Sequence, residues 1–518
     1  MRIPRISRMI TLVILALLAM LIGLLLIFAV NRSSQEENWW TAPRTTKNTA
    51  IAYVEATTVG YLLPTMRPPG APILTPTPDS VHDLPPMRTD PDSYVVQGGD
   101  SLGWIASRYG VSIEQIVQEN DLANPNLLAV GQLLVIPAPI PSGPGPDFKI
   151  IPDSELVYSP GNIPFDAASF IRQQGGYLAG YSEEIENRAL SGAQILQRIT
   201  RDYSVNPRLL LAVLEYQSGW LTNPKPTEAE KEYPMGLINP QRKDLFSQLS
   251  WAANELNRGY YLYRVNGVSS WLVSDGSVVP VDPTINAGTA GVQNLFAALY
   301  DRDGWEQAVS AEGLFATYEE LFGYPFDYAI EPLLPSGLTQ PMMQLPFESD
   351  KVWAFTSGPH GAWGDGTAWG ALDFAPPGDQ VGCVPSDDWV TAVADGLILR
   401  AEDGVVIQDL DGDGHEQSGW VVLYLHVESR DRVNPGAYLM AGESIGHPSC
   451  EGGISTGTHL HLARRYNGEW IPADQGIPFD LDGWVSSGTG VEYDGYLERE
   501  SELKEAYAGR RPGNEIER

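Results

Sequence analysis

An almost unbroken apolar run from residue 10 to residue 30 is the first feature of the hydrophobic pattern, and it follows a basic stretch over residues 1–8. At a rise of about 1.5 Å per residue, about 20 residues cross a bilayer core of about 30 Å. Phe28-Ala29-Val30 is a poor signal-peptidase site, so the pattern favours an uncleaved anchor over a cleaved signal peptide. We predict that residues 1–30 form a cytoplasmic stub and a single transmembrane helix, with all later domains extracytoplasmic. Secretion after cleavage is the alternative.

The segment 93–137 has the apolar spacing of a small α+β unit. Tyr94-Val95-Val96 is a short strand, and one helical face is shared by Leu102, Ile105, Ala106 and Tyr109. A second helix follows over residues 113–120, and residues 131–137 return as a strand, which predicts the order βααβ. Before this unit, residues 31–92 are rich in Pro and Thr, a composition that predicts an extended, semi-rigid linker.

A mostly helical region is predicted over residues 162–344, after a second Pro- and Gly-rich linker at residues 138–161. Five stretches carry apolar residues at three- and four-residue spacing: Gln194–Tyr203, Pro207–Gly219, Lys243–Val265, Thr289–Tyr300 and Leu314–Phe322. Pro207 suits a first helical turn, and Gly219 suits the end of the same helix.

Over residues 345–500 the pattern changes to short β-branched and aromatic runs between Gly, Asp and Pro turns. The strands expected from these runs are Trp389–Ala394, Leu397–Ala401, Val405–Asp409, Gly419–His426 and Gly457–Arg465. They predict a small, mainly antiparallel β domain. Residues 501–518 are predicted to form a charged C-terminal tail, loose over residues 510–518.

Length and charge narrow the class of protein. A chain of 518 residues is too long for one ordinary core, so several domains are expected. The formal net charge of −32 argues against a nucleic-acid partner, because phosphate binding needs clustered Lys and Arg. It also disfavours docking on an anionic membrane surface and suits a soluble body held away from one.

Six of the seven histidines lie in the predicted β domain. Alternate residues of a strand point to the same face, so His459 and His461 are predicted to project together. A catalytic zinc has three protein ligands and keeps one position for water. His360, Asp373 and His461 supply such a set, which leaves His459 free to act on the water and His426 as a further donor. Each histidine taken alone is better read as an ordinary surface or core residue, but their concentration in turns and strands favours a metal site.

The motifs around these residues resemble the lysostaphin-like zinc endopeptidases that cleave peptidoglycan cross-bridges, in particular their beta-lytic branch. The family's Ser-Thr-Gly-x-His-x-His strand is matched by residues 455–461, its Tyr-x-His strand by residues 424–426, and its small-residue strand with aspartate by residues 372–375. The resemblance covers roughly a quarter of the chain. It implies the following roles: one zinc ion bound by His360, Asp373 and His461, with His459 as general base and His426 stabilising the oxyanion.

The position of the first ligand differs between branches of this family. In the commoner branch it lies four residues before the aspartate, where this chain has Trp369. The beta-lytic branch places it on a longer loop, thirteen residues before the aspartate, as His360 is here. We therefore predict His360 as the first ligand, with Asp365 as the alternative. His415 and His447 are not expected to be ligands.

Residues 93–137 resemble a lysin motif (LysM), a βααβ module that binds N-acetylglucosamine glycans. The resemblance rests on the Gly-Asp-Ser-Leu start at 99–102, Tyr-Gly-Val at 109–111 and the Gly-Gln-x-Leu-x-Ile-Pro end at 131–137. It implies that the glycan of peptidoglycan is a partner. A small domain without sugar affinity is the alternative, because a fold alone does not fix a function.

The stretch Leu209–Trp220 faintly resembles the helix of lysozyme-like lytic transglycosylases that ends in a catalytic Glu-Ser. In that register the glutamate position is Gln217, and an amide cannot protonate a glycosidic oxygen. Glu215, two residues earlier, is a weak candidate for a glycan site. We expect the helical region to be non-catalytic, and either to grip glycan or to be only structural.

A run of alternate carboxylates, Asp409, Asp411 and Asp413, imitates the first half of a calcium loop. The twelfth position, where a bidentate glutamate should complete the ligand shell, is Trp420. A tight, solvated hairpin turn is the favoured interpretation, and calcium is the minor alternative.

Cys383 and Cys450 are the only cysteines. In an exported chain an even pair favours a disulfide. A zinc role for them is not expected, because the histidine and aspartate set already supplies the protein ligands.

Together these features predict a membrane-anchored, LysM-targeted zinc endopeptidase that hydrolyses the peptide cross-bridges of bacterial peptidoglycan. The alternative is a non-catalytic wall-binding scaffold or an activator of another wall hydrolase. The expected partners are peptidoglycan and, through the N-terminal helix, the bacterial cell membrane.

Overall fold

The computed structural model describes residues 76, 78–97, 100–378 and 381–518. The predicted anchor at residues 1–30 and most of the 31–92 linker lie outside this part of the chain. Within the described part, no helix combines the length and apolar character needed to span a bilayer. The described end of the linker is packed, since Asp79 pairs with Lys149 at 2.6 Å and His82 Nε2 lies 3.0 Å from the carbonyl oxygen of Tyr263.

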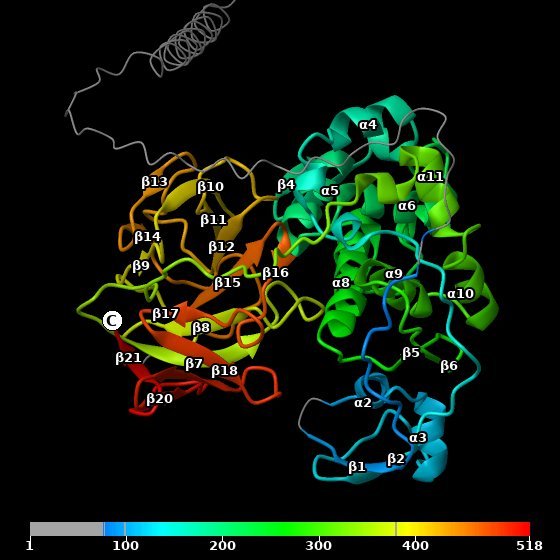
Figure 1. Ribbon diagram of the computed structural model, residues 1–518, viewed down its shortest axis with the longest axis horizontal. Helices are drawn as coiled ribbons and strands as arrows, with labels where there is room; N and C mark the ends of the chain where they lie inside the picture. The colour runs from blue at the N-terminus through cyan, green and yellow to red at the C-terminus, as the bar shows by residue number, and fades with distance from the viewer. Residues whose placement is uncertain (1–75, 77, 98–99, 379–380) are drawn as a thin grey trace, which may run out of the picture. The chain divides into compact units, whose positions relative to one another are not determined.

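The first domain has the predicted βααβ order (Figure 1). Strands β1 (Asp92–Val95) and β2 (Leu133–Ile136) pair antiparallel, and helices α2 (Leu102–Tyr109) and α3 (Ile113–Glu119) connect them. Helix α3 begins at a capping box formed by Ser112 and Gln115. Buried apolar side chains of both helices and both strands form a core of their own.

Helices α4 to α11 form the helical domain. Their bounds are α4 Ala167–Gln174, α5 Gly192–Tyr203, α6 Pro207–Ser218, α7 Glu228–Glu232, α8 Asp244–Arg264, α9 Ala287–Ala297, α10 Arg302–Ala308 and α11 Leu314–Phe322. Short elements complete it: 3-10 turns η1 Asp153–Glu155, η2 Pro160–Asn162, η3 Tyr177–Gly180 and η4 Pro325–Tyr328, and hairpins of β3 Ser182–Ile185 with β4 Arg188–Ser191 and of β5 Ser270–Leu272 with β6 Val278–Pro280.

The helices predicted from apolar spacing are present as α5, α6, α8, α9 and α11. Helix α6 starts and stops as expected: Asn206 accepts a hydrogen bond from the backbone N–H of Arg208, Pro207 occupies the first turn, and Gly219 ends the helix at φ +63°. The short helices α4, α7 and α10 have too few turns to give a clear apolar period.

The β domain is built on a nine-stranded antiparallel sheet in the order β13-β10-β11-β12-β15-β8-β7-β21, with β16 beside β15 (Figure 1). The strands are β7 Val352–His360, β8 Ala371–Ala375, β10 Gly396–Glu402, β11 Val405–Asp409, β12 Trp420–Leu425, β13 Tyr438–Leu439, β15 Leu460–Tyr466, β16 Glu469–Trp470 and β21 Glu515–Glu517. Two smaller sheets accompany it: β9 Val390–Thr391 with β14 Ser444–Gly446, and the series β17 Asp480–Leu481, β18 Trp484–Gly488, β19 Gly495–Arg499 and β20 Glu502–Glu505.

Both faces of the large sheet are covered, which explains why its strands read as continuous apolar runs. In β12, Val421, Leu423 and Leu425 belong to a core shared with the helical domain, whereas Val422 and Tyr424 belong to the inner core of the β domain. Alternate residues of a strand face opposite sides of a sheet. The helical domain therefore packs on the sheet face that carries Leu425, and the residue directly opposite Leu425 on β15 is a histidine, at position 461.

The charged C-terminal segment is ordered, and the prediction that residues 510–518 are loose was wrong. Strand β20 extends the small sheet, and β21 pairs with β7 at the edge of the large one. Ile516 is 1% exposed, and Asn514 Nδ2 donates to the carbonyl of Phe355 at 2.9 Å. Charged residues are common on edge strands because they oppose edge-to-edge association. A loose tail has the same charged composition, so the sequence pattern did not distinguish the edge strand from a tail.

Candidate metal centre

Four neighbouring strands of the large sheet carry the candidate site. His360 is the last residue of β7, Asp373 lies in β8, and His461 lies in β15 directly opposite Asp373. His459 comes just before β15, and His426 comes just after β12. The antiparallel ladder thus brings together side chains that are far apart along the chain.

Three atoms of this set converge. Nε2 of His360 lies 3.1 Å from Nδ1 of His461, and Oδ1 of Asp373 lies 3.3 Å from the first and 3.2 Å from the second. Zinc bonds of about 2.0–2.2 Å in a tetrahedral site place neighbouring ligand atoms about 3.3–3.6 Å apart. All three residues are buried. The triangle formed by these three atoms is therefore close in size to one face of the tetrahedron of ligand atoms around a zinc ion.

The hydrogen bonds of the two imidazoles fix which nitrogens are bare. His360 Nδ1 donates to the carbonyl of Gly358 at 2.8 Å, and His461 Nε2 donates to the carbonyl of Ala362 at 3.0 Å. Because a carbonyl only accepts, a neutral ring has no proton left on the nitrogen that faces the other ring. Asp373 Oδ1 is buried and has no hydrogen-bond donor. Two lone pairs and a carboxylate oxygen in contact favour a cation between them, and two imidazoles with one carboxylate are a donor set that zinc accepts.

The charges of the set keep the carboxylate ionised. Burial alone would raise the pKa of Asp373, but His360 and His459 outweigh it and hold this pKa well below its ordinary value. Burial likewise acts to lower the pKa of His360, but the charge of Asp373 outweighs it and the pKa is raised. The pKa of His461 is lowered, mainly by burial. Asp373 is therefore anionic at neutral pH, as a metal ligand must be.

His459 and His426 lie beside the set, with ring centroids 4.5 Å apart. Nε2 of His459 is 3.7 Å from Oδ2 of Asp373, and its Nδ1 donates to the carbonyl of Gly457 at 2.7 Å. His426 Nδ1 donates to the carbonyl of Glu451 at 2.8 Å. The neutral form of each ring thus has a bare Nε2 that can accept a proton. Burial lowers the pKa of His426 to about 3, so His426 can donate to an oxyanion only after it has taken up a proton.

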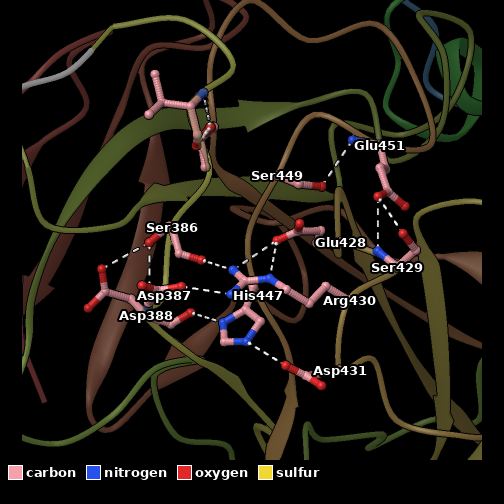
Figure 2. A network of polar contacts seen from close by, with 12 residues as sticks. Ser386, Asp387, Asp388, Glu428, Ser429, Arg430, Asp431, His447, Ser449 and Glu451 are labelled. Atoms are coloured by element: carbon pink, nitrogen blue, oxygen red, sulfur yellow. Dashed lines mark hydrogen bonds and ion pairs between the residues drawn. The ribbon is translucent and has the colours of Figure 1, made fainter.

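Glu451, whose carbonyl accepts the hydrogen bond of His426, belongs to a network of polar contacts (Figure 2). Oε1 of Glu451 accepts from the backbone N–H and the hydroxyl of Ser429 at 2.9 and 3.0 Å, and Oγ of Ser449 accepts from the backbone N–H of Glu451 at 3.0 Å. His426 has a left-handed backbone, φ +67°, which is uncommon outside glycine. The network provides the surrounding support that such a conformation needs.

His447 belongs to this network and not to the convergent set (Figure 2). Its Nδ1 lies 2.9 Å from the carbonyl oxygen of Asp388, its Nε2 lies 3.8 Å from Asp431, and its ring packs on Trp389. Nearby, Arg430 pairs with Asp387 and Glu428.

Two residues of the loop between β18 and β19 join the site without any signal in the sequence. The ring of Tyr493 stacks on that of His360 with centroids 4.8 Å apart, and Glu492 Oε1 accepts from the backbone N–H of Gly361 at 3.3 Å. Tyr493 also has a left-handed backbone, φ +71°. Its position depends on how the small sheet docks, and no local pattern encodes that.

The alternative first ligand, Asp365, is not part of the convergent set. Its side chain is 74% exposed and pairs with Arg258 at 3.0 Å. The structure brings His360, and not Asp365, to Asp373 and His461.

The family model for the LasA N-terminal domain matches residues 149–334, and that for the LysM domain matches residues 94–137. Protease LasA of Pseudomonas aeruginosa is 26% identical over 314 residues, which are 55% of this chain and 69% of LasA. The N-acetylmuramoyl-L-alanine amidase XlyA of Bacillus subtilis is 39% identical over 61 residues, 12% of this chain and 20% of the amidase. The solved M23 metalloprotease pseudoalterin matches 35% of this chain and 100% of its own with 24% identity and a TM-score of 0.28.

The chain is a metalloendopeptidase similar to the lysostaphin-like enzymes, and it carries a lysin motif.

In this metalloendopeptidase Glu215 has a structural role at the end of α6. Its carboxylate accepts from the backbone N–H groups of Leu221 and Thr222 at 2.8 and 3.2 Å, and from the Thr222 hydroxyl. Gln217 accepts from the Tyr300 hydroxyl at 2.7 Å. A carboxylate with both oxygens engaged is not poised to protonate a glycosidic oxygen. The lysozyme-like resemblance of the helical domain stays an expectation.

The aspartates of the possible calcium loop lie together at the turn between β11 and β12. Asp409 accepts from the backbone N–H groups of Gly412 and Gly414 at 3.0 and 2.9 Å, and Asp413 accepts from the Ser418 hydroxyl at 2.7 Å. Burial, followed by the neighbouring carboxylates, raises the pKa of Asp411 to about 8. These bonds stabilise a ten-residue connection between the two strands, which is longer than the tight turn predicted, and calcium stays a minor alternative.

Cys383 and Cys450 form a disulfide across 67 residues of sequence. Beside it, the backbone N–H of Thr458 donates to the carbonyl of Gly382 at 3.1 Å, and the Thr458 hydroxyl accepts from the backbone N–H of Val384 at 2.9 Å. The disulfide therefore ties together the loops that lead to β9 and to His459.

Proposed function

We propose that this metalloendopeptidase uses one zinc ion to hydrolyse the peptide cross-bridges of bacterial peptidoglycan. The observation that carries the proposal is the convergence of three buried acceptor atoms, from His360, Asp373 and His461, with Nε2 of His459 beside them at 3.7 Å from Asp373 Oδ2. The bacterial cell wall as the place of action is supported by the lysin motif and by relatives named as a protease, an amidase and a cortical fragment-lytic enzyme.

Each site residue has a task that follows from its bonds. When bound, zinc polarises the scissile carbonyl and lowers the pKa of its water toward about 7. His459, held by the Gly457 carbonyl, accepts a proton from the attacking water at Nε2 and passes it to the leaving amine. His426, once protonated, donates from Nε2 to the carbonyl oxygen as negative charge develops there.

The other domains serve to bring the site to its substrate. The lysin motif holds the enzyme on the glycan, which raises the local concentration of cross-bridges without any new contact at the active site. The apolar run at residues 10–30 anchors the chain in the bacterial membrane with its amino end in the cytoplasm. The linker at residues 31–92 then provides reach from the membrane to the wall.

Two measurements on protein lacking residues 1–30 test the proposal. Metal analysis is expected to find about one zinc per chain in the wild type and in His459→Ala, and almost none in His461→Ala. Mass analysis of muropeptides is expected to show opened cross-bridges after digestion with wild type and intact ones after His459→Ala. His415→Ala, a histidine outside the set, is the control and should behave as wild type. A wild-type protein that binds the wall but neither holds zinc nor opens cross-bridges would instead be a scaffold.

A further inference from the structure

The helix α8 (Asp244–Arg264) presents a polar stripe to the β domain. Four of its residues, spaced three or four apart and so on one side of the helix, each reach one partner there. The contacts are Asn254 Oδ1 with the backbone N–H of Gly366 (2.9 Å), Arg258 with Asp365 (3.0 Å), the Tyr261 hydroxyl with the backbone N–H of Trp470 (2.8 Å) and Arg264 with Glu469 (2.7 Å).

Two of these contacts fall on the loop 361–370, which joins His360 to the strand of Asp373. Helix and loop approach closely here: a Cβ added to Gly366 would lie 2.1 Å from the carbonyl oxygen of Asn254. A side chain at position 366 would collide with the backbone of α8, so the loop lies directly against the helix. The hydrogen bond from Gly366 to the Asn254 side chain opposes movement away from it.

The loop behaves as one unit because its own hydrogen bonds cross-link it. The backbone N–H of Ala362 donates to the carbonyl of Ala368, and Thr367 Oγ1 accepts from the backbone N–H of Trp363 and donates to the carbonyl of Gly364, each at 2.9 Å. A displacement at Gly366 is therefore passed to Ala362.

Ala362 is the point at which the loop meets the metal set. Its carbonyl accepts the Nε2 proton of His461 at 3.0 Å, which leaves Nδ1 of His461 bare and aimed at Asp373 and His360. Groups that hold the non-ligating nitrogen of a metal-binding histidine fix its tautomer and its orientation. The loop thus determines how His461 is presented.

We propose that Asn254 is a positioning residue for the metal centre, and that the helical domain, through α8, is a structural part of that centre. Asn254 acts through Gly366 and the cross-linked loop on the Ala362 carbonyl, and so on the ring of His461. This inference rests on the zinc site of the proposed function. It goes beyond that function because it gives the helical domain a task at the metal.

The test uses Asn254→Ala and Asn254→Asp in the full chain, with zinc affinity measured by competition with a chelator. Loss of a partner that holds a ligand directly costs about 10- to 100-fold in metal affinity, and Asn254 acts one step further out, so Asn254→Ala is expected to weaken zinc binding about 3- to 10-fold. Asn254→Asp keeps an acceptor oxygen for Gly366 and is expected to restore the affinity to within about 2-fold of wild type. In the metal-free protein, hydrogen exchange of the amides at residues 361–370 should be faster in Asn254→Ala than in Asn254→Asp.

Asn294→Ala is the matched control, because Asn294 Nδ2 donates to the carbonyl of Glu255 on α8 at 2.8 Å within the helical domain. It should change neither zinc affinity nor exchange in the loop. The proposal is overturned if Asn254→Ala leaves both readouts at wild-type values, or if Asn294→Ala reproduces the loss. Failure of the wild type to bind zinc would overturn the proposed function instead, and exchange in the metal-free loop still tests the contact with α8.

Discussion

Nε2 of His360 and Nδ1 of His461 lie 3.1 Å apart, although 101 residues separate the two histidines in the chain. In each ring the N–H of the other nitrogen donates to a backbone carbonyl. The lone pairs of His360 Nε2 and His461 Nδ1 therefore face each other in a buried place. In the folded chain this arrangement costs free energy until a cation occupies the space between the rings. Metal binding and folding are therefore expected to be coupled.

Zinc is expected to stabilise the folded protein. At a free zinc concentration a thousand times the dissociation constant, the free energy of unfolding should rise by about 4 kcal/mol over the metal-free protein. Asp373→Asn removes the one negative charge of the ligand set and should abolish most of this gain. Denaturant unfolding with zinc and with a chelator measures it. Asp365→Asn is the control and should keep the gain, and the opposite result for the two variants would show that Asp365 is the ligand.

Replacing His459 is expected to stop catalysis without releasing the metal. His459→Ala removes the Nε2 that receives the proton of the attacking water, and general-base catalysis is worth about 100- to 10,000-fold in rate. We therefore expect kcat on a labelled cross-bridge peptide to fall by that factor, with KM and zinc content close to wild type. Loss of zinc in this variant would instead make His459 a ligand.

How much of the site could be predicted from the sequence depends on how local each signal is. His459 and His461 share a face because of strand geometry, and the fold then brings Asp373 opposite His461. The buried strands β11 and β12 were recognisable because both of their faces are covered. Tyr493 and the contact of α8 with the loop after His360 could not be predicted, because both depend on how separate sheets and domains dock.

Among the strands that the sequence did not predict, β7 and β21 have residues that imitate other structures. Strand β7 (Val352–His360) contains Gly358-Pro359, a typical turn pair, just before its last residue, and the structure accommodates this pair with irregularities in the pairing with β8. Strand β21 (Glu515–Glu517) is mostly charged because it lies at a sheet edge. In both cases the local composition is that of a loop or tail, and only pairing with a distant strand determines the conformation.

Removing the disulfide is expected to destabilise the protein without emptying the metal site. Cys383 and Cys450 close a loop of 67 residues, which corresponds to about 4 kcal/mol in the chain-entropy model. The double variant Cys383→Ser with Cys450→Ser should lose about that much free energy of unfolding in denaturant titrations. Zinc content should stay near wild type, since the ligands lie on β7, β8 and β15. A reducing agent should lower the free energy of unfolding of the wild type to that of the variant and leave the variant unchanged. If it destabilised the variant as much as the wild type, the loss would not come from the disulfide.

The buried carboxylate of Glu416 is expected to make the protein sensitive to acid. Burial by itself would raise its pKa, but Arg400, Arg465 and Arg201 outweigh burial and hold the pKa below its ordinary value of 4.5. Such a group contributes stability above the unfolded-state pKa, and this contribution is lost as pH falls through the lower pKa of the folded state.

Glu416→Gln is therefore expected to cost about 3–5 kcal/mol at pH 7, because it leaves Arg465 buried without its carboxylate and leaves Arg400 with Asp202 alone. Below pH 4.5 the wild type should lose stability more steeply than the variant, so the two curves of unfolding free energy against pH should converge in acid. Glu402→Gln, at an exposed neighbouring position, should follow the wild type throughout. A constant difference between wild type and Glu416→Gln down to pH 2 would mean that this carboxylate titrates alike in the folded and unfolded chain.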